Sequence, residues 1–334
     1  MIEAYPRVVV YAVLAVLLVG AVAAAIWVRR MTRPPAPVLS SSKQPQPPGG
    51  KPARAPAQPP APQQQADRPR VVFSMTTTPE RFEHVHETVE SLLKSAVRPD
   101  AVYLHLPAAS RRTGEPYPEA LGDELERLQA VYGERLRVNR VQHDVGPLTK
   151  LHPTLALETD ADTRIITADD DELYPPHYHD ELLRQSLAHP EWVVAYRGLE
   201  ITDVRRGAYE FVNGGDGLQQ VHVVEGYTGV VYRRQHFRDD FVPPEDDCAC
   251  VTTDDVWVSA YLAGRGVPRV LIGGGLPMGD ARGLGNAAHP MQPRNHVAAI
   301  SPLFEKNHSA GDRNARCIRA SWRVIETIPV RPMR

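Results

Sequence analysis

From residue 70 onward, short apolar runs alternate with amphipathic segments, and this alternation predicts the order of strands and helices. Runs rich in β-branched residues predict strands at 70–75, 101–106, 136–141, 163–168, 192–196 and 269–272, with a hairpin-like pair at 220–224 and 229–232. Apolar residues three or four positions apart predict helices at 79–96, 118–132, 148–157, 177–188 and 254–263. This order is typical of an α/β fold with a mainly parallel sheet covered on both faces.

The N-terminal segment has a different pattern. Residues 8–28 carry no charged side chain, and at about 1.5 Å rise per residue they span roughly 30 Å, the thickness of a bilayer's hydrocarbon core. We therefore expect a transmembrane helix here, preceded by a short tail at 1–7. The alternative is a cleaved signal peptide, because the alanine-rich end of the segment resembles a cleavage zone.

A segment rich in proline and glutamine follows. Residues 29–70 contain twelve prolines and six glutamines but almost no large apolar side chain, so they cannot bury enough surface to fold. We expect a disordered stem over 29–69, in which proline favours an extended chain of about 3.1 Å per residue. The remainder, 70–334, is expected to form one large domain.

Charge is distributed unevenly along the chain. The whole chain has a formal net charge of −2, residues 1–28 sum to zero and residues 29–70 carry +7, so residues 71–334 carry −9. An acidic domain is a poor general binder of nucleic acid, whose affinity depends on neutralising phosphates. If the domain binds a phosphorylated ligand, a metal ion is the expected source of positive charge.

Two features disagree on the side of the membrane that the large domain occupies. The arginines of 29–33 outnumber Arg7, and the positive-inside rule then places the domain in the cytoplasm. A proline-rich stem behind an N-terminal anchor instead favours the Golgi or secretory lumen. The cysteines leave the question open, because Cys248 and Cys250 are too close for an obvious pair and either could reach Cys317.

The strand predicted at 163–168 ends in three consecutive carboxylates, Asp169, Asp170 and Asp171. Adjacent carboxylates repel one another, so water or a divalent cation must screen them. Oxygen ligands suit Mg²⁺ or Mn²⁺, which bind through one or two carboxylates together with substrate phosphates. The run therefore predicts a metal held against a diphosphate. The alternative is a solvated acidic turn before the next helix.

Two more polar segments follow predicted strands, where ligands of α/β sheets bind. SMTTTPER, at 74–81, leads into a helix N-terminus that can meet a base, a ribose or a phosphate. Simple capping by Thr78 is the alternative. DVGPLTK, at 144–150, places Lys150 upstream of the acidic run, where it can contact a phosphate or remain a solvated side chain.

A second acidic pair, Asp254 and Asp255, follows Thr253 at a predicted helix start. Helix capping alone explains this pattern. The functional alternative uses one of the two carboxylates as a general base toward an acceptor hydroxyl.

Five blocks resemble, in order, those of GT-A fold glycosyltransferases, which use nucleotide-diphosphate sugars: SMTTTPER, DVGPLTKL, IITADDDELYP, GYTGVVYRR and TDDVWVSAYLAGRGVPRV. The resemblance spans about residues 70–320 and implies a Rossmann-like, three-layer α/β/α catalytic domain. It further implies a membrane-anchored, hexosyltransferase-like enzyme. The donor would be a nucleotide-diphosphate sugar, and the acceptor would be a hydroxyl of a glycan, a protein or a lipid.

The resemblance also implies a metal site for Mn²⁺ or Mg²⁺. Asp169 and Asp171 match the family's Asp-X-Asp motif, with Asp170 between them. Many relatives add a C-terminal histidine to the metal, and His308 is the nearest candidate here.

Further roles follow from the same resemblance. Thr76, Thr77 and Arg81 would lie around the nucleotide, and Lys150 near the diphosphate. One carboxylate of the pair at 254–255 would face the acceptor. Base catalysis by that carboxylate would imply inversion at the anomeric carbon.

Two other classes of function fit parts of the pattern. A metal-dependent phosphoester hydrolase also needs clustered aspartates, but such sites usually add several histidines, and we expect His177 and His179 to lie on the surface. A catalytically inactive, membrane-tethered protein that binds carbohydrate or a sugar nucleotide would keep the site without turnover. The glycine-rich segment 201–220 matches none of the blocks, and we expect it to shape acceptor choice.

Overall fold

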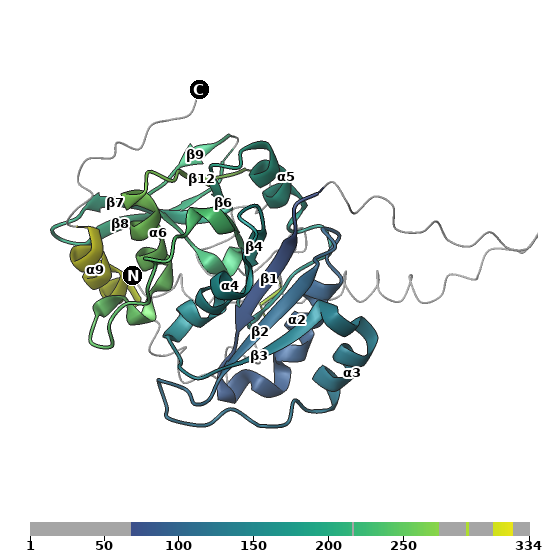
Figure 1. Ribbon diagram of the computed structural model, residues 1–334. Helices are drawn as coiled ribbons and strands as arrows, with labels where there is room; N and C mark the ends of the chain where they lie inside the picture. The colour runs from purple at the N-terminus through teal and green to yellow at the C-terminus, as the bar shows by residue number, and fades with distance from the viewer. Residues whose placement is uncertain (1–67, 216, 274–291, 294–309, 323–334) are drawn as a thin grey trace, which may run out of the picture. The chain divides into compact units, whose positions relative to one another are not determined.

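The computed structural model describes residues 68–215, 217–273, 292–293 and 310–322 (Figure 1). By internal contacts the chain divides into Met1–Gln63 and Gln64–Arg334, and every described residue belongs to the second unit. The expected transmembrane helix at 8–28 and His308 lie outside the described residues, as does almost all of the expected stem. None of the helices that are described is long and apolar enough to cross a membrane.

Within the described residues, the central sheet has eight strands in the order β3-β2-β1-β4-β11-β6-β12-β9. Its first half is parallel and consists of β3 (Leu136–Val141), β2 (Ala101–Pro107), β1 (Val71–Thr76) and β4 (Arg164–Thr167). The other half consists of β11 (Val230–Arg233), β6 (Val193–Ala195), β12 (Arg269–Leu271) and β9 (Gln219–Gln220). β11 runs antiparallel to both of its neighbours, whereas β6 and β12 are parallel. The fold is therefore mixed α/β with a mostly parallel central sheet, as the sequence predicts.

Helices cover both faces of this sheet. Phe73 and Met75 of β1 are buried on the face covered by α2 (Val85–Leu93), α3 (Asp123–Tyr132) and α5 (Asp180–Ala188). Val72 is buried on the opposite face, against the 3₁₀ helix η3 (Gly146–Lys150), α4 (His152–Leu157) and α6 (Asp254–Gly264). A strand buried on both faces needs apolar residues at consecutive positions, which explains the unbroken run at the start of β1.

The predicted hairpin at 220–224 and 229–232 is wrong. β10 (Val223–Val224) pairs with β7 (Arg197–Asp203), whereas β11 pairs with β4 and β6. The unmatched segment 201–220 instead contributes to an antiparallel hairpin of β7 and β8 (Ala208–Asn213), which joins β10 in a second, three-stranded sheet. Apolar periodicity identifies strands but not their partners, because pairing depends on long-range packing.

Several predicted helices have different bounds in the structure. The segment expected to form one helix at 148–157 is divided between η3 and α4, and the helix expected at 177–188 begins at Asp180. The segment expected to form one helix at 79–96 contains a 3₁₀ helix, η1 (Pro79–His84), followed by α2. The helix expected at 118–132 begins at Asp123, because Gly122 has a φ of 78°, outside the helical region.

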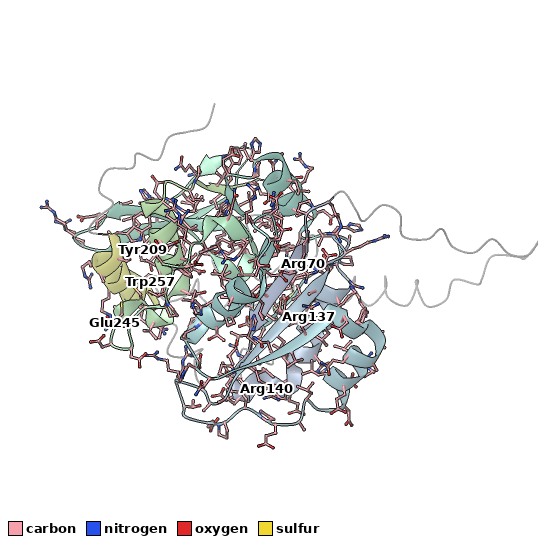
Figure 2. The ribbon with its side chains drawn as sticks, viewed as in Figure 1. Arg70, Arg137, Arg140, Tyr209, Glu245 and Trp257 are labelled. Atoms are coloured by element: carbon pink, nitrogen blue, oxygen red, sulfur yellow. A yellow bond between two sulfur atoms is a disulfide. The ribbon has the colours of Figure 1, made fainter. Side chains whose placement is uncertain are left out.

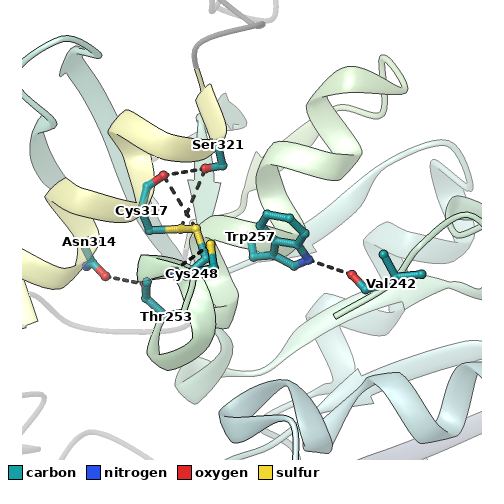
Figure 3. Close-up of a disulfide and its surroundings, with 8 residues drawn as sticks. Val242, Cys248, Thr253, Trp257, Asn314, Cys317 and Ser321 are labelled. Atoms are coloured by element: carbon teal, nitrogen blue, oxygen red, sulfur yellow. Dashed lines mark hydrogen bonds between the residues drawn. A yellow bond between two sulfur atoms is a disulfide. The ribbon is translucent and has the colours of Figure 1, made fainter. Parts of the chain in front are cut away.

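The C-terminal helix α9 (Ala310–Ser321) is joined to the 3₁₀ helix η6 (Ala249–Thr252) by a disulfide between Cys250 and Cys317 (Figure 3). This pairing answers the question that the cysteine spacing left open, and Cys248 keeps a free thiol. Because η6 leads directly into α6, the disulfide fastens α9 beside the start of α6.

Candidate functional site at the carboxyl edge of the sheet

A cavity of about 250 Å³ opens at the carboxyl ends of β1 to β4. Its wall comes from the segments that follow these four strands and from η6. This is the edge at which open α/β sheets bind ligands. Six residues that the sequence assigned to a donor or a metal line the cavity: Thr76, Thr77, Arg81, Lys150, Asp169 and Asp170.

Asp170, the middle carboxylate of the acidic run, is held on both of its oxygens. The Thr77 hydroxyl donates to Oδ2 at 2.6 Å, and Arg81 Nη1 donates to Oδ1 at 2.6 Å. The backbone oxygen of Asp170 also accepts from the Thr88 hydroxyl at 3.0 Å. With its side chain only 8% exposed, Asp170 ties the turn after β4 to the turn after β1.

Asp171 has a less complete set of partners. Arg81 Nη1 lies 3.2 Å from its Oδ2, while burial and the neighbouring carboxylate of Asp170 raise the pKa of Asp171 to about 6. Next to it, burial and the charges of Asp171 and Asp169 raise the pKa of Glu172 to about 9. Glu172 Oε2 is buried without a hydrogen-bond partner among the described residues. Negative charge is therefore incompletely compensated on this side of the acidic run.

Lys150 connects the acidic run to α6. Its Nζ lies 2.6 Å from Asp169 Oδ1 and 3.5 Å from Asp254 Oδ2, and its side chain is 7% exposed. Burial disfavours the ammonium form, but the nearby carboxylates outweigh this effect and hold the pKa of Lys150 well above its ordinary value. Lys150 is thus a buried cation between two acidic segments rather than a solvated side chain.

Asp255 lies beside the same ammonium and is fixed by a glycine. The backbone N–H of Gly226 donates to Asp255 Oδ1 at 2.9 Å. A Cβ at Gly226 would lie 3.0 Å from that oxygen and 3.1 Å from Lys150 Nζ, so a larger residue would push into both groups. Burial and the adjacent Asp254 raise the pKa of Asp255 well above its ordinary value, and burial likewise raises that of Asp254.

The threonines at the two helix starts do not cap them through their side chains. Thr78 occupies the N-cap position of η1 without a capping hydrogen bond, and its hydroxyl is buried and unpaired within the described ranges. Thr253 occupies the N-cap position of α6, but its hydroxyl donates to Asn314 Oδ1 of α9. Thr76, also in the cavity wall, donates to the backbone oxygen of His105 at 2.9 Å.

The expectation for the two histidines is half wrong. His177 is exposed and lies 2.7 Å from Asp180, as expected for a surface residue. His179 is fully buried against the rings of Phe73 and Tyr178, and burial lowers its pKa to about 3. The pattern of polar and apolar residues does not reveal that His179 is buried, because an imidazole can pack in a core in place of an aromatic ring.

Several residues of the cavity wall carry no role in the sequence-based prediction, among them Arg111, Arg112 and Tyr117. These three come from the irregular segment after β2, where no periodicity marks them. The two arginines place positively charged side chains at the cavity, although the domain as a whole has a net negative charge and a metal ion was the expected source of positive charge. Domain charge therefore does not predict the local charge of this site.

No group of three or more histidine, cysteine, aspartate or glutamate side chains in the described part of the chain is arranged to hold a metal ion. Mg²⁺-type ions need fewer protein ligands, because they also bind waters and substrate phosphates. Asp169 and Asp171 are 31% and 28% exposed, and the unpaired oxygen of Glu172 lies on the next residue. This donor set fits a hard divalent cation.

No protein-family model matches this chain, and no curated protein matches it either. Among solved structures, the fold is similar to the crystal structure of GalNAc-T7 with UDP, GalNAc and Mn²⁺, with a TM-score of 0.48 and 10% sequence identity over 62% of this chain. The match covers 43% of the length of that protein. Similarity at this level assigns no activity or substrate to this chain.

Proposed function

We propose that this protein is a glycosyltransferase of the GT-A type that moves a sugar from a nucleotide-diphosphate donor to an acceptor hydroxyl. The observation that carries the proposal is that Lys150, which lines the cavity together with Asp169, contacts both Asp169 and Asp254, so that the acidic run and the start of α6 meet at the carboxyl edge of the sheet. Group transfer requires the donor and the base for the acceptor to be adjacent, and this convergence supplies that proximity.

On the donor side, Asp169 and Asp171 are the residues that would hold Mn²⁺ or Mg²⁺. When bound, such an ion supplies Lewis-acid stabilisation of the leaving diphosphate. Thr76 and Thr77 present the end of β1 to the nucleotide. Asp170 acts as a positioning residue, because both of its oxygens are used by Thr77 and Arg81.

On the acceptor side, Asp255 is the general base. Asp254 is held by Lys150, whereas Asp255 accepts through Oδ1 from Gly226 N–H and receives no hydrogen bond on Oδ2 from any described residue. A raised pKa makes this carboxylate a stronger base than an exposed aspartate, which suits proton removal from a hydroxyl. Attack from the face opposite the diphosphate inverts the anomeric carbon.

The enzyme is further proposed to be anchored by residues 8–28, with its catalytic domain in an oxidising lumen such as that of the Golgi. The Cys250–Cys317 disulfide supports this side of the membrane. Disulfides persist in oxidising compartments and are rare in the cytoplasm. This observation favours the lumen over the cytoplasmic side that the arginines at 29–33 suggest.

A thermal-shift screen of nucleotide sugars in the presence of Mn²⁺ tests the proposal, because a bound donor raises the melting temperature by mass action. A hit that is followed by sugar transfer to an acceptor supports it. Release of phosphate from simple phosphoesters without an acceptor would instead identify a hydrolase. Donor binding without any turnover would identify a binding protein, and no binding of any nucleotide sugar would contradict the proposal.

A further inference from the structure

Four cationic side chains line the cavity: Arg81, Arg111, Arg112 and Lys150. Three of them already have a carboxylate partner, at 2.6 Å for Arg81, 2.6 Å for Lys150 and 2.7 Å for Arg111. The pairs of Arg81 and Lys150 are largely buried, whereas Asp246, the partner of Arg111, is 93% exposed. In each case a carboxylate of the protein already neutralises part of the positive charge that an anionic ligand would need.

Arg112 is different. Its guanidinium forms no ion pair and no hydrogen bond with any residue that the structure describes. Its backbone is nevertheless fixed, because Arg112 N–H donates to Ser110 Oγ at 3.3 Å and Gly114 N–H donates to the Ser110 backbone oxygen at 2.7 Å. A constrained turn after β2 thus presents an uncommitted guanidinium at the cavity.

Other positive charges lie close to Arg112. Burial, together with the charges of Arg313 and Arg81, lowers its pKa, and the carboxylates of Asp144 and Glu80 offset only part of this effect. Arg313 belongs to α9, which the Cys250–Cys317 disulfide fastens beside η6 (Figure 3). Guanidinium groups brought near one another repel, and an anion between them removes that repulsion.

We infer that Arg112 binds the diphosphate of the donor, with paired N–H groups directed at two phosphate oxygens. The identity of the ligand rests on the proposed function, and the contact is one that sequence reasoning assigned to Lys150. The planar guanidinium of arginine can donate two parallel hydrogen bonds to two oxygens of one phosphate, whereas a lysine ammonium acts as a point charge. Lys150 keeps its place between Asp169 and Asp254.

Calorimetric titration of the whole chain with inorganic pyrophosphate, and separately with UDP and GDP, tests this inference in the presence of Mn²⁺. The variants are Arg112→Gln, Arg112→Lys and the control Arg140→Gln. Arg140, labelled in Figure 2, lies on β3, where its Nη2 donates to the backbone oxygen of Glu119. It is not among the residues that line the cavity. Melting temperatures without ligand show that each variant is folded.

We expect Arg112→Gln to raise the Kd for pyrophosphate at least tenfold, Arg112→Lys to raise it by less, and Arg140→Gln to leave it within twofold of the unchanged protein. An Arg112→Gln variant within twofold of the unchanged protein would overturn the inference, and so would a failure of the unchanged protein to bind pyrophosphate. Pyrophosphate binding that needs Arg112, without binding of any nucleotide, would keep the inference and remove the nucleotide-sugar proposal. Nucleotide binding that does not change in Arg112→Gln would remove the inference and keep the nucleotide-sugar proposal.

Discussion

Lys150 Nζ lies 2.6 Å from Asp169 Oδ1 in a setting where the lysine side chain is only 7% exposed. The same ammonium reaches Asp254 Oδ2 at 3.5 Å. A single buried cation therefore joins the acidic run after β4 to the acidic start of α6. Two motifs that are far apart in the sequence are parts of one site.

Replacing Lys150 with methionine should lower the free energy of unfolding by about 3 kcal/mol, because two carboxylates in a buried setting lose their shared partner. Urea unfolding measures the loss. Adding Asp254→Asn to that variant should recover part of it, since the neutral amide needs no cation. A double variant whose losses simply add would contradict a shared charge network.

The acidic run should divide into a structural and a functional residue. Asp170→Asn weakens the bonds from Thr77 and Arg81 and should cost about 2 kcal/mol of stability. Asp171→Asn should leave stability within about 0.5 kcal/mol, because its carboxylate is 28% exposed and only partly paired. Thermal or urea unfolding of the two variants distinguishes them, and equal losses would refute this division.

Two buried histidines, His105 and His179, should each lower stability in mild acid, whereas the buried carboxylates of Asp171 and Glu172, whose pKa values are raised, act in the opposite direction. Burial lowers the pKa of His105 and of His179 to about 3 in the folded chain, whereas the unfolded chain binds a proton below about pH 6.5. Between these pH values the unfolded state holds more protons. Each histidine therefore removes up to about 1.4 kcal/mol of stability per pH unit as the pH drops from about 6.5 toward 3.

Urea unfolding at several pH values checks this expectation. His179→Phe keeps an aromatic ring beside Phe73 and Tyr178 and should reduce the slope of stability against pH. The control His177→Gln alters an exposed imidazole and should leave most of that slope in place. Identical slopes in His179→Phe and the unchanged protein would rule out His179 as a source of the acid sensitivity.

The disulfide between Cys250 and Cys317 should contribute about 4 kcal/mol, because it closes a loop with a sequence separation of 67 residues. Changing both cysteines to serine should lower the melting temperature and make it insensitive to reductant. Cys248→Ser should behave like the unchanged protein. Alkylation of the native, unreduced chain should label one thiol, and labelling of three would show that the pair is not oxidised.

Local sequence pattern was enough to predict the parallel half of the sheet. A strand such as β1, buried on both faces, is a continuous apolar run, and consecutive parallel strands end at one edge. For that reason Thr77 and Asp169 could be assigned to the same cavity before any geometry was known. Partner choice could not be predicted, since nothing local tells β11 to pair with β4 rather than with β10.

The sequence also could not predict which charged residues are paired within the protein and which remain available to a ligand. Asp169, Asp170 and Asp171 have the same side chain, so the sequence does not distinguish their roles. Only the folded structure shows that both carboxylate oxygens of Asp170 accept hydrogen bonds, whereas Glu172 Oε2 has no partner among the described residues. Arg112 lies in an irregular turn, where neither periodicity nor a motif marks it. Burial and pairing are three-dimensional properties, so a cation's availability is visible only after folding.

The base is tested by a matched pair of variants. Asp255→Asn should retain donor binding but lower sugar transfer by about 10²-fold or more, because general-base catalysis typically contributes at least this much. Asp123→Asn makes the same chemical change at the exposed start of α3 and should transfer normally. Normal transfer by Asp255→Asn would move the base elsewhere.

The central claim is that Asp169 and Asp171 hold a divalent cation against the donor diphosphate. Cleavage of a nucleotide sugar, measured with Mn²⁺ and with chelator for the unchanged protein and for Asp171→Ala, tests it most directly. We predict cleavage that requires Mn²⁺ and falls to background in Asp171→Ala while the variant remains folded. Full cleavage in chelator, or undiminished cleavage by Asp171→Ala, would contradict the claim.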